Sequence, residues 1–440
     1  MKYFIQTYGC QMNVHESEKV AGVLEDFGYR QAEKQEDADV IVFNTCCIRE
    51  GAETKIFSNI GNIKGLKKKK KGLIVAVLGC MTQQKKSADN LKEKFPWIDI
   101  IIGTFNAHLF EEYFKKVLDE KKKVFDLFEK EEEIKENSKF FRTSGTNAWV
   151  NISYGCDNFC TYCIVPYVRG RERSRKSENI INECKELIAS GYKSITLLGQ
   201  NVNSYGKGLE EEISFPMLCR KICALDGDFK LKFMTSHPKD FSEELIDVIA
   251  TEEKMSKVVH LPCQSGSNKI LESMNRHYLR EYYLDCVEKL RQKVPNVVLT
   301  SDFIVGFPGE TEEDFEQTCD LVKTVRYNSI FAFIYSKRKG TEAEKMPEQV
   351  DIAVKRRRVN ELLAIQHEIT KEKDKEMKGQ ILDCLIQEKK GKQLAISESG
   401  KSIYLINEGD YDLTKYHKVE VVEIKENKVF GKVLSNGEER

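Results

Sequence analysis

The chain has 440 residues, of which 40% are hydrophobic and 32% charged, and its formal net charge is zero. This length predicts two or three domains, and no apolar run is long enough to cross a membrane. The N-terminus also lacks the apolar stretch of a secretory signal, so we expect a cytoplasmic protein. In that reducing compartment, fourteen cysteines predict metal ligands, catalytic thiols or core residues rather than disulfides.

The first 118 residues alternate short apolar runs with helical patterns. Helical spacing is seen over Ser17–Phe27 and Ala52–Ile63. This alternation predicts an open α/β sheet with parallel strands. The expected strands are Phe4–Tyr8, Val40–Asn44, Leu73–Leu78 and Ile98–Ile102.

Residues 119–147 are highly charged and predict a linker, with one short strand at Val124–Phe128. From residue 148 to 350 the alternation resumes, with helical patterns at Ile180–Ala189, Glu244–Ala250 and Phe315–Val325. Six such units predict a barrel or a (β/α)6 part-barrel, with functional residues at the carboxyl ends of its strands. The expected strands are Val150–Tyr154, Ile195–Leu198, Leu231–Thr235, Val258–Leu261, Val297–Val305 and Ile330–Tyr335.

Residues 351–375 read as a polar connecting helix. Residues 376–440 then carry five short strand patterns with turn residues between them, which predict a small all-β barrel. These strands are Ile381–Ile386, Gln393–Ile396, Ser402–Leu405, Lys418–Ile424 and Val429–Leu434.

Three cysteines, Cys156, Cys160 and Cys163, follow the first strand of the central domain. Three thiolates at this spacing can bind three irons of a cubane cluster and leave the fourth iron free for chemistry. The alternative is a zinc site, which normally needs four ligands, and no nearby Cys or His completes such a set. The spacing therefore favours an iron–sulfur cluster.

A second set, Cys10, Cys46 and Cys80, has one cysteine beyond each of three expected strands. The carboxyl ends of neighbouring parallel strands converge, so these thiols could hold a second cluster with an open iron. Cys47 is an alternative to Cys46 as the ligand. The remaining cysteines lie in apolar helical or strand patterns and are expected in the cores: Cys184, Cys219, Cys223, Cys286, Cys319 and Cys384.

The segment Cys156–Cys163, with Tyr162 before its last cysteine, resembles the radical S-adenosylmethionine (SAM) signature. Ordered blocks along nearly the whole chain are similar to the methylthiotransferase family. These blocks are Ile164–Tyr167, Arg169–Arg175, Leu198–Asn203, Thr235–Pro238, Leu261–Gly266 and Asp302–Thr311. Cys263 departs from the pattern, because a small aliphatic residue is commoner there.

The segment Gly9–Asn13 resembles the branch of that family that acts on N6-isopentenyladenosine beside the tRNA anticodon. Asn44–Cys46, Ile48–Glu50 and Met274–Arg276 fit the same branch. Two other branches act on threonylcarbamoyladenosine in tRNA and on an aspartate of a ribosomal protein, and they remain alternatives. A non-catalytic iron–sulfur protein that binds RNA is the alternative from another class.

The resemblance implies a methylthiotransferase domain, a radical SAM part-barrel and a C-terminal RNA-binding TRAM domain. It implies two 4Fe-4S clusters, held by Cys156, Cys160 and Cys163 and by Cys10, Cys46 and Cys80. The first cluster would reductively cleave SAM, the resulting radical would take hydrogen from C2 of adenine, and the second cluster would supply sulfur. A second SAM would supply the methyl group. The partners are then tRNA, through its anticodon stem-loop, and an electron donor protein.

SAM contacts are expected at the strand ends and beside the cysteine loop. By resemblance they are Tyr162, Arg173, Gly199, Gln200, Gln264, Ser265, Ile304, Gly306 and Gly309. For the glycines, the alternative to a role in SAM binding is that they simply form an ordinary turn. Arg169, Arg171, Arg173 and Arg175 form either a solvated loop or a site for the SAM carboxylate and RNA phosphates.

Overall fold

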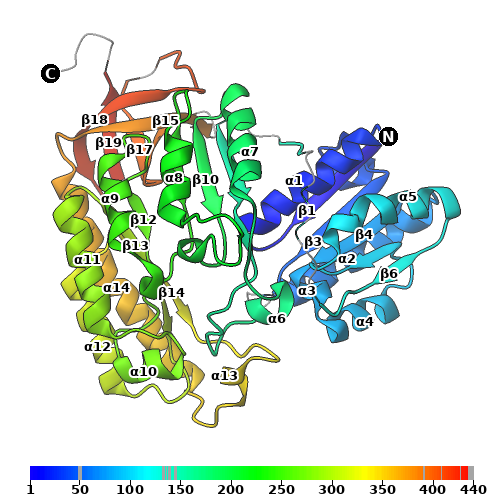
Figure 1. Ribbon diagram of the computed structural model, residues 1–440, viewed down its shortest axis with the longest axis horizontal. Coiled ribbons are helices and arrows are strands. Elements are labelled where there is room, and N and C mark those ends of the chain that lie inside the picture. The colour runs from blue at the N-terminus through cyan, green and yellow to red at the C-terminus, as the bar shows by residue number, and fades with distance from the viewer. Residues whose placement is uncertain are drawn as a thin grey trace.

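The computed structural model describes residues 1–47, 52–130, 134, 136, 140–142, 146–389, 392–407, 409–426 and 428–434. Three units lie side by side: an N-terminal α/β domain, a central part-barrel and a C-terminal β-barrel (Figure 1). Ile48–Glu50, part of the branch resemblance, lies outside the described residues. No described helix is both long enough and apolar enough to span a membrane.

The N-terminal domain is an open parallel sheet with the strand order β2-β1-β3-β4-β5-β6. Its strands are β1 (Lys2–Thr7), β2 (Arg30–Gln31), β3 (Val40–Thr45), β4 (Ile74–Gly79), β5 (Ile100–Ile102) and β6 (Val124–Asp126). Its helices are α1 (Gln11–Asp26), α2 (Ala52–Lys69), α3 (Cys80–Gln83), α4 (Lys85–Lys94) and α5 (Phe110–Glu120). β3 and β4 are buried along their whole length, as expected for apolar strands covered by helices on both faces. The predicted parallel α/β sheet is confirmed.

Two boundaries differ from the sequence expectation. α1 begins at Gln11, directly after Cys10 and six residues before the expected start at Ser17. Its first turns bury polar residues such as Asn13 and His15 against other parts of the protein, so no apolar period marks them. β6 pairs with β5, so the N-terminal sheet extends past residue 118 to Asp126.

The central domain forms two three-stranded parallel sheets, β11-β10-β7 and β12-β13-β14, joined by a bridge between Leu231 and Met255. Within the described ranges, β7 and β14 each pair on one side only, so they are the free edges between which the part-barrel is open. Its strands are β7 (Asn147–Asn151), β10 (Ser194–Leu198), β11 (Lys230–Phe233), β12 (Val258–His260), β13 (Val298–Val305) and β14 (Ser329–Ile334). Its outer helices are α7 (Ser177–Ala189), α8 (Phe215–Cys223), α9 (Glu243–Thr251), α10 (Asn268–Ser273), α11 (Arg280–Lys293) and α12 (Glu312–Val325). The predicted part-barrel is confirmed.

Short elements follow the first and last strands of the part-barrel. These are the hairpin β8 (Ser153–Tyr154) with β9 (Arg173–Ser174), the five-residue helix α6 (Val165–Arg169), and α13 (Glu342–Lys345). The cysteines expected in the cores are buried there: five join the part-barrel core, and Cys384 joins that of the C-terminal barrel.

The polar helix α14 (Ile352–Glu376) leads to the closed C-terminal barrel, with the strand order β15-β16-β17-β19-β18. The strands are β15 (Ile381–Lys389), β16 (Lys392–Ser397), β17 (Ser402–Leu405), β18 (Tyr416–Lys425) and β19 (Lys428–Val433). Lys232 of β11 donates to the Glu398 carbonyl at 3.3 Å, and Tyr416 lies beside Ser194, the first residue of β10. The barrel therefore sits at the amino ends of these strands, opposite the face where the cysteines lie (Figure 1).

Candidate active site

One cysteine follows each of three neighbouring strands of the N-terminal sheet. Cys10 precedes α1, Cys46 follows β3, and Cys80 opens α3 directly after β4. β3 pairs with both β1 and β4, so the three positions lie along one edge of the sheet. Gly9 has φ 104°, and a Cβ there would lie 2.7 Å from Cys46 Sγ. Only glycine therefore lets the turn before Cys10 approach Cys46 this closely.

Two buried asparagines hold these strand ends in place. The side-chain amide of Asn13 donates to the Tyr8 carbonyl at 2.7 Å and to the Thr45 carbonyl at 3.0 Å. Asn44 donates in turn to the Asn13 carbonyl at 2.8 Å. The amides thus replace missing ladder partners where β1 and β3 end. This explains physically why asparagines stand in the segments Gly9–Asn13 and Asn44–Cys46.

Arg169 reaches this cysteine site from the central domain, at the end of α6. It is 6% exposed, donates to Asn13 Oδ1 at 2.5 Å, and hydrogen bonds Cys80. Burial alone would lower the pKa of Arg169, but the neighbouring Cys80 and Cys10 thiolates raise it. A hydrogen bond from Cys47 and the charge of Arg169 lower the pKa of Cys80 against the effect of burial. The surroundings of Cys80 therefore favour the thiolate form of that one cysteine.

Cys46 and Cys47 are both buried but contact different partners. Cys46 lies against the Gly9 turn, whereas the Cys47 thiol hydrogen bonds Cys80. That bond, together with burial, raises the pKa of Cys47. Cys46 thus lies beside the turn that precedes Cys10, and Cys47 contacts Cys80 from the apolar core.

The second cysteine set lies in the loop Cys156–Cys163, directly after β8. Met274 and Asn275, at the end of α10, hold this loop. The Met274 carbonyl accepts from the Thr161 amide at 3.1 Å, and Asn275 donates to the Asn158 and Phe159 carbonyls, each at 3.1 Å. Phe159 has φ 45° and Asn275 φ 59°, left-handed conformations that are tolerated because these bonds hold the loop.

Arg276 also holds the loop in place through hydrogen bonds. Its guanidinium donates to Cys160 Sγ at 3.3 Å, to Tyr162 Oη at 3.4 Å and to the Pro262 carbonyl at 2.9 Å, and it is 4% exposed. Burial raises the pKa of Cys156 to about 11 and that of Cys163 to about 12. The sequence indicated Met274–Arg276 only as a family block. The role of Arg276 becomes visible only in the fold, which buries its guanidinium beside Cys160.

The helix α6 connects the two cysteine sets directly, because it begins two residues after Cys163 and ends at Arg169. A second link is Gln200, whose amide lies 2.5 Å from Met12 Sδ of α1. A cavity lies along this seam. Its lining residues come from both domains: Asn13, Glu16, Asn44, Leu78, Gly79, Thr104, Phe105, Ala107, Tyr154, Arg169 and Arg173.

Part of the expected SAM set surrounds the cysteine loop. Gly199 directly follows β10 and lies beside Ser153, where a Cβ would lie 2.6 Å from the serine hydroxyl. Gln264 has φ 74°, and its backbone bonds to Asp302 and Ile304 of β13 at 2.8 and 2.9 Å. Ile304 and Tyr162 pack against one small apolar cluster. These positions suit ligand contact.

The other expected SAM residues have structural partners. The Ser265 hydroxyl lies 3.4 Å from that of Thr318 on α12. A Cβ on Gly306 would lie 2.3 Å from the Lys355 side chain, and the Gly309 amide donates to the Glu348 carbonyl at 2.8 Å. The two glycines thus let β13 pack closely on the segment that enters α14.

The four arginines of the Arg169–Arg175 segment have separate roles. Arg171 is exposed and pairs with Asp157 at 2.9 Å, whereas Arg173 lines the interdomain cavity. Arg175 is 4% exposed and pairs with Glu183 at 2.8 Å and with Glu136 at 2.7 Å. It therefore stabilises the part-barrel rather than a ligand.

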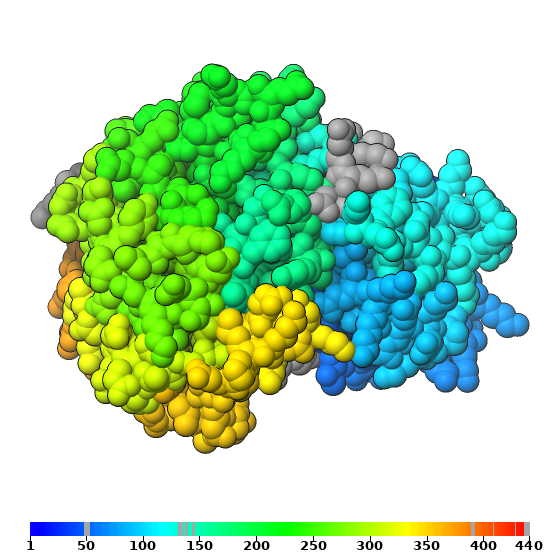
Figure 2. Space-filling model, turned by 60° about the horizontal axis from the view of Figure 1, so that its bottom comes forward, coloured from blue at the N-terminus to red at the C-terminus, as the bar shows by residue number. Residues whose placement is uncertain are grey.

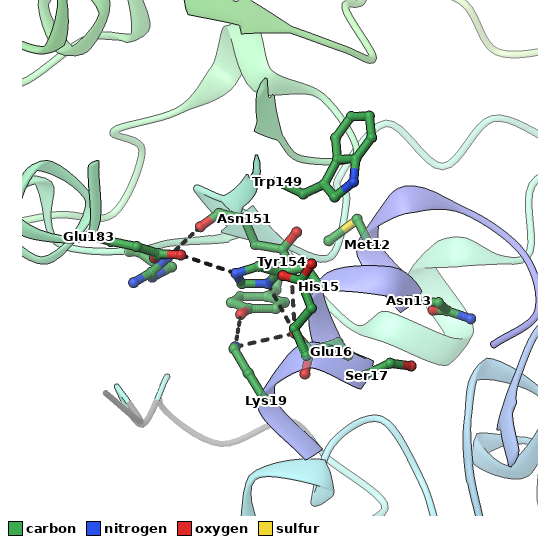
Figure 3. Close-up of polar contacts among 12 residues, drawn as sticks. Met12, Asn13, His15, Glu16, Ser17, Lys19, Trp149, Asn151, Tyr154 and Glu183 are labelled. Atoms are coloured by element: carbon green, nitrogen blue, oxygen red, sulfur yellow. Dashed lines mark hydrogen bonds and ion pairs between the residues drawn. The ribbon is translucent and has the colours of Figure 1, made fainter. Parts of the chain in front are cut away.

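A buried polar network joins α1 to the central domain (Figure 3). His15 Nε2 lies 3.3 Å from Glu183, and Lys19 donates to Tyr154 Oη at 2.7 Å and to Glu16 at 3.2 Å. Burial alone would raise the pKa of Glu183, but His15, Arg175 and Arg142 hold it well below its usual range. This network fixes the position of Cys10, Cys46 and Cys80, the N-terminal triad, relative to the cysteine loop Cys156–Cys163.

Each cysteine set supplies three thiols, the number that a cubane cluster with one open iron binds. Across the described ranges, no three Cys, His, Asp or Glu side chains converge on a point where one metal ion would sit. A cubane cluster binds each thiolate on a different iron, so its ligands need not converge. A structural zinc site takes four ligands, whereas each set offers three cysteines.

The mouth of the part-barrel also suits a polar ligand such as SAM. Five buried polar atoms just beyond the ends of β7, β10 and β11 have no hydrogen-bond partner within the described part of the chain. They are Ser153 Oγ, Asn201 Oδ1, Asn203 Nδ2, Ser236 Oγ and His237 Nε2. Buried polar atoms are costly to leave unpaired, so such a cluster points to a ligand that bonds with them.

Two family models match the chain: "Uncharacterized protein family UPF0004" over residues 2–103 and "Radical SAM superfamily" over residues 150–322. The fold and the cysteine loop thus define a radical SAM protein with an N-terminal domain of the first family. Three clostridial proteins named tRNA-2-methylthio-N(6)-dimethylallyladenosine synthase are similar over most of their length. The proteins from Clostridium botulinum strains Okra and Alaska E43 are 51% and 49% identical, covering 93% and 98% of this chain and 92% and 95% of theirs. The Clostridium perfringens SM101 protein is 53% identical, covering 88% of this chain and 86% of its own.

The chain therefore belongs to the family of tRNA-2-methylthio-N(6)-dimethylallyladenosine synthases, which are sulfur-group transferases. Among solved structures, the radical SAM methyltransferase TsrM from Kitasatospora setae matches with a TM-score of 0.57 and 15% identity, covering 78% of this chain and 77% of TsrM. The cobalamin-dependent radical enzyme OxsB matches with a TM-score of 0.51 and 13% identity, covering 84% of this chain and 56% of OxsB. At these identities the likeness concerns the fold alone.

Proposed function

We propose that this protein inserts a methylthio group at C2 of N6-dimethylallyladenosine in the anticodon loop of tRNA, in the cytoplasm. The carrying observation is that two cysteine triads face one interdomain seam and are joined by α6, which ends at Arg169. Cys156, Cys160 and Cys163 would hold one 4Fe-4S cluster, and Cys10, Cys46 and Cys80 the other. When bound, these clusters and SAM supply the one-electron chemistry and sulfur that an unactivated aromatic C–H bond requires.

The side chains of this protein then have definable roles. Arg276 donates to Cys160 Sγ and orients the loop, while Arg169 stabilises anionic sulfur at Cys80. The unpaired polar atoms at the barrel mouth, among them His237 Nε2 and Ser153 Oγ, would bind the polar groups of SAM. We place Tyr162, Gly199, Gln200, Gln264 and Ile304 around SAM. Arg173 lies farther along the seam, in the cavity.

The test uses anaerobically reconstituted protein with SAM, a reductant in place of the electron donor protein, and tRNA carrying dimethylallyladenosine. The tRNA is digested to nucleosides, which are identified by mass spectrometry. We expect a nucleoside heavier by one methylthio group in place of one hydrogen, and about eight irons per chain, four for each cubane.

Other outcomes would overturn the proposal in distinct ways. Formation of 5′-deoxyadenosine without a methylthio nucleoside would turn attention to threonylcarbamoyladenosine tRNA or a ribosomal protein. About four irons per chain and no SAM cleavage would instead indicate a non-catalytic iron–sulfur protein.

A further inference from the structure

Two phenylalanines on β14 are unusually exposed for residues of a barrel strand. Phe331 is 53% and Phe333 51% exposed, whereas Ile330, between β14 and its covering helix, is buried in the core. Alternation along the strand turns both rings to the inner face of the part-barrel. Because β14 is a free edge, that inner face is open to the outside there. Large apolar side chains exposed together indicate a binding surface.

The neighbours of these rings are polar on one side and apolar on the other. Register pairs Phe331 with Asp302 and Phe333 with Ile304. His260 lies edge-on to Phe331, with centroids 6.1 Å apart, and its Nε2 is 3.5 Å from Asp302. The surface therefore combines two ring faces with a donor and an acceptor at their border. Aromatic faces with adjacent polar groups are typical of sites that bind an unstacked nucleobase.

The surface is continuous with the cysteine loop. Ile304, beside Phe333, packs against the same apolar cluster as Tyr162, which lies between Cys160 and Cys163 in the loop. A base held against the rings would therefore have one end near the loop. An apolar substituent on that base would lie between the two rings and the apolar cluster beside Ile304. Its burial there would leave no polar group unpaired.

A basic segment follows β14 and matches the charge of RNA. It comprises Lys337, Arg338 and Lys339, and the Lys339 ammonium lies close enough to Lys86 to lower the pKa of Lys86. This stretch of the chain reaches across to the N-terminal domain (Figure 2). Two solvent-exposed cations from different domains repel each other unless an anion lies between them. A backbone phosphate next to the bound nucleotide would be such an anion.

Resting on the proposed function, we propose that Phe331 and Phe333 bind the adenine and its N6-dimethylallyl group. These two side chains then select prenylated over unprenylated tRNA. The rings contact the face of the base and the hydrocarbon, while the His260–Asp302 pair borders the base edge. The basic segment contributes affinity for any RNA, but the rings contribute the preference for the prenyl group.

The test measures dissociation constants of reconstituted holoprotein for two anticodon stem-loops that differ only in the dimethylallyl group. Wild type is expected to prefer the prenylated RNA. In Phe331→Ala/Phe333→Ala that preference should fall by about 10-fold, because the rings no longer bury the hydrocarbon that distinguishes the two RNAs. Tyr282→Ala is the matched control, since Tyr282 is a 42% exposed aromatic on the outer helix α11. It should keep the full preference.

SAM cleavage without RNA verifies that the double variant is folded and loaded. An unchanged ratio of the two dissociation constants in a variant that cleaves SAM would overturn the inference. Equal affinity of wild type for both RNAs would overturn it too. If wild type prefers prenylated RNA through these rings but makes no methylthio product, the site stands and the proposed reaction fails.

Discussion

The two cysteine triads are assembled by different means, and their electrostatic surroundings differ accordingly. The triad at 156, 160 and 163 lies within one loop, and burial raises the pKa of Cys156 and Cys163. The triad at 10, 46 and 80 takes one residue from each of three strand ends, and Arg169 from another domain helps to lower the pKa of Cys80. A loop triad can thus form as soon as its loop is anchored. The other requires both the finished sheet and the docked second domain.

The largest expected effects come from removing a cysteine of each triad. Cys160→Ala should abolish SAM cleavage, because it removes one of the three proposed ligands of the loop cluster, the sulfur to which Arg276 donates. Cys46→Ala should keep SAM cleavage but block sulfur insertion, because it affects only the N-terminal triad. Formation of 5′-deoxyadenosine and of methylthio nucleoside, measured in parallel, separates the two.

Cys47→Ala is the matched control for Cys46→Ala, because the two cysteines are adjacent and both buried. We expect it to keep measurable sulfur insertion. Full product from Cys46→Ala with none from Cys47→Ala would reverse the assignment of the ligand.

Arg169 tests whether the N-terminal triad depends on the second domain. Arg169→Leu removes the cation beside Cys80 and leaves Asn13 Oδ1 without its donor. Residues that orient metal ligands typically change metal affinity by about 10- to 100-fold. We therefore expect the N-terminal cluster to be lost to a chelator about 10-fold faster, with the loop cluster unaffected.

The measurement is iron released per chain over time, with each cluster followed by its electron paramagnetic resonance signal. Arg169→Lys keeps a positive charge and should lie between the variant and wild type. Equal loss of both clusters in Arg169→Leu would show that Arg169 maintains the general fold and not the triad.

Arg276 tests the loop triad in a corresponding way. A hydrogen bond to a ligand sulfur stabilises the more negative, reduced cluster, so its removal lowers the reduction potential. Arg276→Leu should lower the potential of the loop cluster by on the order of 50 mV, a little under tenfold in the one-electron equilibrium. A redox titration followed by electron paramagnetic resonance measures this, with the N-terminal cluster as an internal reference. An unchanged potential would limit Arg276 to holding the loop backbone.

The same contrast explains what could be predicted from sequence. The spacing of Cys156, Cys160 and Cys163 carries its chemistry locally, so residue pattern alone indicated a cluster. For Cys10, Cys46 and Cys80 the pattern gave only strand ends, and the sheet order was needed to bring them together. Arg169 and Arg276 could not be assigned, because a sequence does not show which arginine the packing of two domains will bury. The early start of α1 was missed for the same reason.

The smallest expected effect concerns the seam that holds the two triads together. Burial lowers the pKa of His15 to about 4, although Glu183 and Glu16 oppose this shift and Lys19 adds to it. His15 is therefore neutral in the folded protein, whereas in the unfolded chain it titrates near 6.5. As pH falls through 6.5 the unfolded state binds the extra proton, so the free energy of unfolding falls by about 1 kcal/mol between pH 7 and 5.5.

His15→Gln removes this titration but keeps an amide able to donate to Glu183, so its stability should fall less over the same interval. Urea unfolding of both proteins at pH 7 and 5.5 gives the difference, and other acid effects largely cancel because both proteins share them. A smaller loss of stability in wild type than in His15→Gln would mean that His15 is protonated in the folded protein and pairs with Glu183 as an ion. An ion pair between His15 and Glu183 would then help to hold the two domains together. Because salt screens exposed charges much more than buried ones, high salt should weaken only the solvent-exposed ion pairs of the seam.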